Sequence, residues 1–164
     1  MTDRFAPPPS TLRDSVSATV ASWLEQQVVD NPAVDSVELD DSGGVVRWVA
    51  RLLGEEKQVS AVWFVIRQRS LLVEPYLMPA PEENVAACLD YLMRRNAKLR
   101  GLAFVIGLED AVYLQAAVPL DWVDADELEW LLGSFYEAVE QSFRPAMRLG
   151  FASRFRDERL ESPK

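Results

Sequence analysis

An acidic stretch, PLDWVDADELEWLL at residues 119–132, carries the side chains with the clearest capacity for chemistry. Five carboxylates fall within nine positions, namely Asp121, Asp124, Asp126, Glu127 and Glu129. If their oxygens converged on one point, they would suit a divalent cation or acid/base catalysis. Acidic residues are also favoured in the first turn of a helix, where the helix dipole stabilises negative charge.

Spacing within the stretch favours the second interpretation. With Asp124 as the N-cap, Glu127 occupies the third helical position, as in a capping box. Asp126 then lies among the free amides of the first turn. The sequence Asp121-x-x-Asp124-x-Asp126 lacks the glycine-containing loop that wraps a calcium ion. We therefore expect these acids to begin a helix and predict no metal site.

The sequence lacks the residues and motifs of other common catalytic sites. The chain has no histidine, which is the commonest general base. Its single cysteine, Cys88, stands among Val85, Leu89 and Leu92, so we expect a buried and unreactive thiol. The sequence contains neither a Gly-x-Ser-x-Gly nucleophile elbow nor a glycine-rich phosphate loop. We predict no catalytic residues, no cofactor and a protein that is not an enzyme.

Net charge argues against two classes of partner. Across 164 residues the formal net charge is −9, which repels phosphate backbones and anionic membrane surfaces. The N-terminal MTDRFAPPPS has no apolar signal-peptide core, and no apolar run approaches the roughly 20 residues of a membrane span. We predict a cytoplasmic protein that binds neither nucleic acid nor membrane.

The elements that must position these residues follow from hydrophobic periodicity. A first helix is expected from residue 10 or 11 to just before Asn31-Pro32, because a residue that precedes proline avoids helical geometry. Two further amphipathic helices are predicted over 81–97, with Pro81 at the first position, and from 124 to about 147. Alternating apolar residues and turn signals predict strands at 36–40, 45–53, 58–67, 70–78, 102–108 and 111–118.

This order is α-βββ-α-ββ-α, with a short extra strand after the first helix. It predicts an α+β fold in which an antiparallel sheet packs against helices. The strand at 58–67, QVSAVWFVIR, is apolar on both faces, so we expect it at the centre of the sheet and covered on both sides. Pro75 cannot donate a ladder hydrogen bond and is expected at a sheet edge or strand end.

Composition divides the chain into three segments. Residues 1–10 include three consecutive prolines and are expected to form a flexible leader. Residues 11–149 are long enough for a single α+β domain with one core. Residues 150–164 are charged, without periodicity, and are predicted to be a disordered tail.

Aromatic residues are the best candidates for contact with a partner. Trp130 lies nearly opposite the face of the last helix set by Leu128 and Leu132, and exposed aromatic residues are enriched at interfaces. We predict partner or dimer contacts at Trp130, Trp122, Tyr113 and Trp48, whereas Trp23 and Trp63 are expected in the core.

The chain resembles the YbjN family, whose members are similar in fold to type III secretion chaperones. The resemblance spans about residues 40–148. It rests on the Arg-Arg-Asn end of the second helix, the hairpin LAFVIGLEDAVYLQAAVPLD and the acidic helix start DADELEWLL. It implies an α+β fold with an antiparallel sheet, frequent homodimerisation, and the binding or regulation of proteins without chemistry.

These observations predict a non-enzymatic protein-binding module, chaperone-like or regulatory, that acts as a homodimer on an unknown protein or peptide. Apart from the resemblance, the reason is a sheet with more apolar surface than three helices cover. The alternative is a small-ligand-binding protein or an enzyme that uses carboxylates in a pocket between sheet and helices. That alternative stays open because the separation of two carboxylates is a property of the fold.

Overall fold

A computed structural model describes residues 9–160 of the chain, with side chains described as far as residue 156. Residues 1–8 of the predicted leader and 161–164 of the predicted tail lie outside the described residues. The elements are α1 (Ser10–Asp30), β1 (Val34–Asp40), β2 (Arg47–Leu53), β3 (Val59–Ile66), β4 (Ser70–Met78), α2 (Val85–Asn96), β5 (Ala103–Ile106), β6 (Val112–Pro119), α3 (Ala125–Gly150) and α4 (Ala152–Leu160). Short 3-10 turns flank β6, η1 (Leu108–Asp110) before it and η2 (Leu120–Trp122) after it.

The six strands form one antiparallel sheet in the order β1-β2-β3-β4-β6-β5. The predicted α+β class is confirmed, including the short strand after the first helix. Pro75 differs from the prediction, because it lies inside β4 opposite Val62 and away from the sheet edge. A register shift between Tyr76 and Met78 follows directly after it on the β6 side, where the missing N–H leaves the ladder incomplete.

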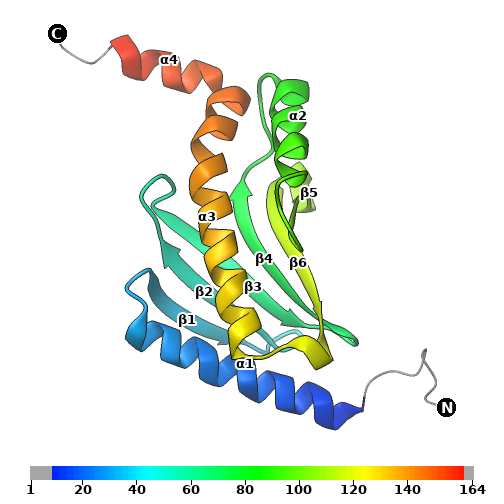
Figure 1. The fold of residues 1–164 in the computed structure, drawn as a ribbon. Coiled ribbons are helices and arrows are strands. Elements are labelled where there is room, and N and C mark those ends of the chain that lie inside the picture. Colours follow the sequence, from blue (N-terminus) through cyan, green and yellow to red (C-terminus); the bar gives the residue numbers. More distant parts are fainter. Residues whose placement is uncertain (1–8, 161–164) are drawn as a thin grey trace.

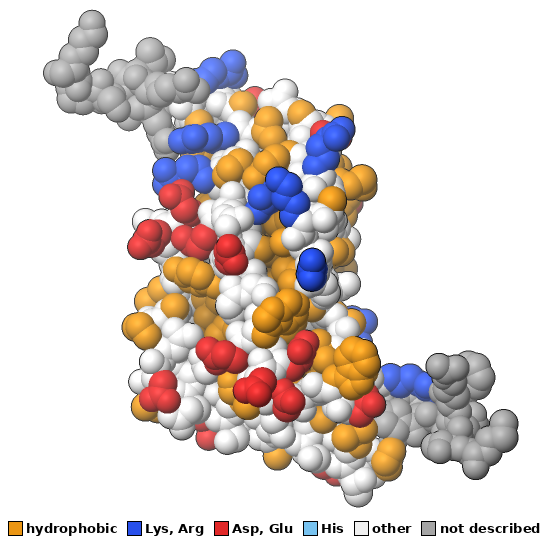
Figure 2. Space-filling model, viewed as in Figure 1, with side chains coloured by type: hydrophobic (Ala, Val, Ile, Leu, Met, Phe, Trp, Pro, Cys, Tyr) orange, Lys and Arg blue, Asp and Glu red, His pale blue; other side chains and the backbone are white. Residues whose placement is uncertain are grey.

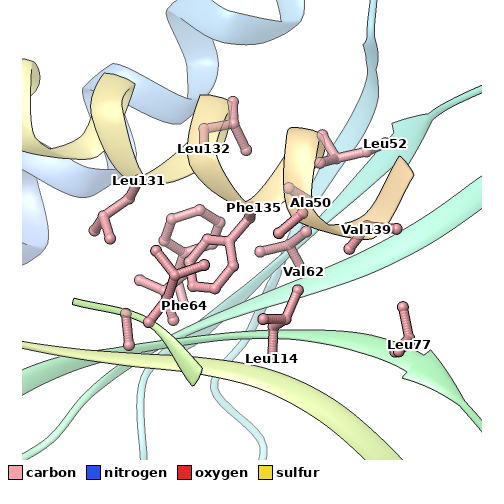
Figure 3. Packing of buried hydrophobic residues seen from close by; sticks show 14 of the residues in the cluster. Ala50, Leu52, Val62, Phe64, Leu77, Leu114, Leu131, Leu132, Phe135 and Val139 are labelled. Carbon is pink, nitrogen blue, oxygen red and sulfur yellow. The ribbon is translucent and has the colours of Figure 1, made fainter. Parts of the chain in front are cut away.

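Helices α1, α2 and α3 lie on one side of the sheet (Figure 1). Beneath them is the core, where Phe135 of α3 packs on the sheet near Phe64 (Figure 3). Trp23 of α1 reaches the same ring at 6.2 Å between ring centroids. Among the described residues no helix covers the other side, so the prediction that β3 is covered on both sides is wrong.

Helix α2 begins at Val85 instead of the predicted Pro81. Its N-cap, Asn84, has a positive φ of 46°, so the chain changes direction immediately before the helix. The residues before Asn84 are bonded to another helix and do not extend α2. The amides of Glu82 and Glu83 both donate to the Gly150 carbonyl at 2.9 Å. These bonds tie the start of α2 to the end of α3.

The prediction of a disordered tail is wrong for residues 150–160. Gly150 ends α3, and α4 follows directly after Phe151, which is only 1% exposed and belongs to the core. Arg154 of α4 lies 4.9 Å from the Phe151 ring and forms an ion pair of 3.1 Å with Glu82. The charged composition of residues 150–160 predicted disorder, but the buried Phe151 anchors this segment to the core.

Candidate interaction surface

The acidic stretch begins α3, as its spacing predicted. Asp124 is the N-cap, and its Oδ1 accepts a hydrogen bond of 2.8 Å from the amide of Glu127. Glu129 instead faces α1, where its Oε2 accepts a 2.9 Å hydrogen bond from Nε2 of Gln27. Within the part of the chain that the structure describes, no three acidic or cysteine side chains are grouped to fit a metal ion. The stretch starts one helix and fastens it to another.

The four aromatic contacts predicted from the sequence do not lie on one surface. Trp122 and Trp130 are 68% and 46% exposed near the start of α3, on the helical side. Tyr113 is half-buried on the uncovered side of the sheet. Trp48 is 5% exposed in the core, so its prediction as a contact is wrong. Along β2 it shares the core-facing side with Ala50.

The uncovered side of the sheet, hereafter the open face, is largely apolar. Its residues alternate with core residues such as Val62 and Phe64 along each strand. Apart from Leu72, its apolar side chains are only partly buried in the chain. The set comprises Val49, Ala61, Trp63, Val65, Leu72, Tyr76, Val105 and Tyr113.

Trp63 occupies a central position on the open face. It pairs across the strands with Val49 on one side and Glu74 on the other. Glu74 continues the row, because its Oε2 accepts a 2.7 Å hydrogen bond from Nε2 of Gln115 on β6. The expectation that Trp63 is a core residue is therefore wrong. Because β3 is apolar on both sides, its sequence did not indicate which side the helices would cover.

The cation beside Trp63 is already paired, and the Glu74 carboxylate opposite Trp63 is hydrogen-bonded to Gln115. The guanidinium of Arg47 lies 5.1 Å from the Trp63 ring and 2.5 Å from the Asp40 carboxylate. Hydrogen bonds from the Ser42 side chain and amide, and then from Arg47, lower the pKa of Asp40 to about 2. Apolar side chains bordered by satisfied charges resemble the composition of protein interfaces.

On the helical side, one carboxylate fastens the turn between β2 and β3 to α3. Glu140 accepts hydrogen bonds from the amides of Glu55, Glu56 and Lys57 at 2.9, 2.8 and 3.2 Å. Arg144, one helical turn further on, forms a 2.7 Å ion pair with Glu56. This long-range connection was not found from the sequence, where GEEK at 54–57 reads as a solvated turn.

Lys57 is buried at the same end of the sheet, with 9% exposure. Its Nζ donates to the Tyr76 carbonyl and lies 5.0 and 5.7 Å from the rings of Tyr76 and Phe143. Burial lowers the pKa of the Lys57 ammonium to about 8. The adjoining hollow has a volume of only about 10 Å³, and the contacts of the amine are with the protein's own carbonyl and rings.

The helical side is divided by charge, as Figure 2 shows. Acidic side chains gather around the start of α3 and beside the β2–β3 turn, whereas Lys and Arg side chains lie toward α2 and the end of α3. No helix within residues 9–160 combines the length and apolarity needed to cross a membrane.

Comparison with known proteins identifies the family. Residues 17–147 match the model of the YbjN family, described as "putative bacterial sensory transduction regulator". The chain belongs to the YbjN family. That description is of a regulator and not of an enzyme.

Mycobacterial proteins are among its relatives. An uncharacterized protein of Mycobacterium leprae is 31% identical over 115 residues, which cover 70% of this chain and 62% of the relative. Uncharacterized proteins of Mycobacterium bovis and Mycobacterium tuberculosis are 32% identical over 110 residues, covering 67% of this chain and 60% of each relative. The chain thus spans about 60% of the length of these relatives.

Proposed function

We propose that this YbjN-family protein is a non-enzymatic, protein-binding regulator that works as a homodimer. The observation that carries the proposal is the open face, where five strands of a six-stranded sheet present apolar and aromatic side chains that no described helix covers. Apolar surface of this kind is stabilised when a second protein removes it from water. The family description supports regulation over catalysis.

A second copy of the chain is the partner we propose for the open face. In a two-fold symmetric contact the same patch serves both subunits, and two sheets pack face to face about 10 Å apart. Trp63 at the centre supplies the kind of aromatic anchor that dominates interface energetics. Arg47 and Asp40 are already paired and need no new partner. The helical side, with Trp122 and Trp130 exposed, is left for the regulated protein or peptide.

Light scattering coupled to size exclusion tests the proposal. The natural chain should elute with twice the mass of one 18.5 kDa subunit. Trp63→Glu should give a folded monomer, because it would remove the aromatic anchor and bury a second carboxylate opposite that of Glu74. Trp122→Glu is the matched control, since this tryptophan is exposed on the helical side, and it should remain dimeric. A monomeric natural chain, or a dimer unaffected by Trp63→Glu, would contradict the proposal.

A further inference from the structure

A second feature, a hollow of about 280 Å³, lies between the α2–β5 connection and the outer side of α3. One wall is the segment 95–102, and the other is formed by Trp130, Ser134, Glu137, Ala138 and Gln141, which recur at helical spacing along α3. Small-molecule sites commonly measure about 300–1,000 Å³, so this hollow is close to the lower end of that range and suits a small ligand.

Positive charge is concentrated in this hollow although the chain as a whole carries −9. Arg95, Lys98 and Arg100 line it, opposed by a single carboxylate, Glu137. None of these three cations forms an ion pair with another described residue. Arg94, the sequence neighbour, points elsewhere and is paired with Asp90 at 2.8 Å. The cations of the hollow are therefore available to an anion.

Arg95 is held in the wall with part of its hydrogen-bonding capacity unused. Its Nη2 donates to Oε1 of Gln141 at 2.6 Å, while its Nε is buried without a partner. Gln141 in turn donates to Glu137 at 2.9 Å, so a neutral amide separates the guanidinium from the carboxylate. A guanidinium presents parallel donors that match the oxygens of a phosphate.

Trp130 gives the hollow an aromatic wall. The side chain is 46% exposed, and its ring atoms lie 3.5 Å from the position that a Cβ on Gly101 would occupy. Gly101 has a positive φ of 73°, and the connection there lies close to the edge of the indole ring. Leu99 and Leu102 add apolar surface beside it. A ring next to several cations favours a ligand that is both planar and anionic.

We propose that this hollow binds a free mononucleotide, with its phosphate held by Arg95, Lys98 and Arg100 and its base stacked on Trp130. A longer nucleic acid is disfavoured, because its further phosphates would meet the acidic start of α3 and the net negative charge of the chain. The site lies on the helical side and does not depend on the proposed dimer.

Calorimetric titration of the natural chain with adenosine 5′-monophosphate tests the proposal. Adenosine and inorganic phosphate, titrated separately, each supply one half of the recognition and should bind at least about tenfold more weakly. Arg95→Gln, Arg100→Gln and Trp130→Leu should each weaken the nucleotide by about tenfold. Arg94→Gln removes the same charge one residue away and should change its affinity by less than about twofold.

Three results would overturn the proposal. The first is no binding of the nucleotide at millimolar concentration. The second is equal loss of affinity in Arg94→Gln and Arg95→Gln, which would indicate general charge attraction. The third is tighter binding of a short single-stranded oligoadenylate, which would replace a free nucleotide with RNA. Circular dichroism of each variant checks its fold, and Arg100→Gln, at an exposed position, keeps the test valid if Arg95→Gln is unstable.

Discussion

The carboxylate of Glu140 on α3 accepts a hydrogen bond of 2.8 Å from the backbone amide of Glu56, which lies in the turn between β2 and β3. A turn leaves amides without partners in the strand ladder, and hydrogen bonds from such amides to a carboxylate are stronger than bonds between neutral groups. By accepting from three consecutive amides, Glu140 both satisfies them and fixes the hairpin against the helix.

Glu140→Ala should therefore lower the free energy of unfolding by about 1–3 kcal/mol. The loss reflects three turn amides that no longer have a fixed acceptor. Glu137→Ala on the same helix is the control, because this carboxylate is exposed and a change within about 0.5 kcal/mol is expected. Urea denaturation measures both, and equal losses would show that the amides are adequately solvated without Glu140.

Lys57 should make stability rise with pH on the alkaline side. Its pKa is lowered from 10.5 to about 8 in the folded chain, whereas the unfolded chain keeps the ordinary value. Between these values the unfolded state binds more protons, so the free energy of unfolding increases with pH. Cys88, Tyr76 and Tyr136, whose pKa values burial raises, act in the opposite direction.

The contribution of Lys57 is isolated by comparison with Lys57→Met, which retains the other three groups. Urea denaturation from about pH 7.5 to about pH 9.5 should show the natural chain gaining stability relative to the variant. A constant difference between the two across this range would mean that the amine is not held in a lowered-pKa environment.

Asp124→Ala should cost about 1 kcal/mol of stability, because the Glu127 amide loses its side-chain acceptor at the start of α3. Asp121, which is exposed in η2 and outside the helix, supplies the control. Thermal denaturation of Asp121→Ala should match the natural chain. If both variants lost the same stability, general charge effects would be responsible and not the cap.

Phe151→Ala should lower the free energy of unfolding by about 3–5 kcal/mol, as expected for a fully buried ring. The residue joins α3 to α4, so hydrogen exchange in α4 should also quicken. Phe155→Ala, at a partly buried position of α4, should cost less. A loss below about 1 kcal/mol for Phe151→Ala would show that α4 is not anchored by this ring.

The spacing of neighbouring residues predicted some helix ends correctly but could not predict contacts between distant segments. The Asp124 cap and the end of α1 before Asn31-Pro32 depend on neighbouring residues, so they could be predicted from the sequence. Contacts between distant segments could not be, and Glu140 is separated from its turn by more than 80 residues. Its role required the position of α3 over the sheet, which no short pattern specifies.

Two other differences also have physical causes. Trp63 and Phe64 are both large aromatic residues, and which of them faces the helices depends on the side of the sheet on which the helices pack. The basic residues after α2 are expected near a helix C-terminus because they complement its dipole, which is a sufficient explanation in sequence. Only the opposing side of α3 shows that Arg95 and its neighbours enclose a hollow.

Strand β3 alternates between two physical roles at successive residues. Val62 and Phe64 have no exposed surface, so substitutions there shift the balance between folded and unfolded chain. Trp63 and Val65 face outward, so substitutions there act mainly on surface properties such as solubility and assembly. Substitutions at the outward-facing positions of β3 can therefore change how such a chain associates. The neighbouring core positions of the same strand preserve its fold.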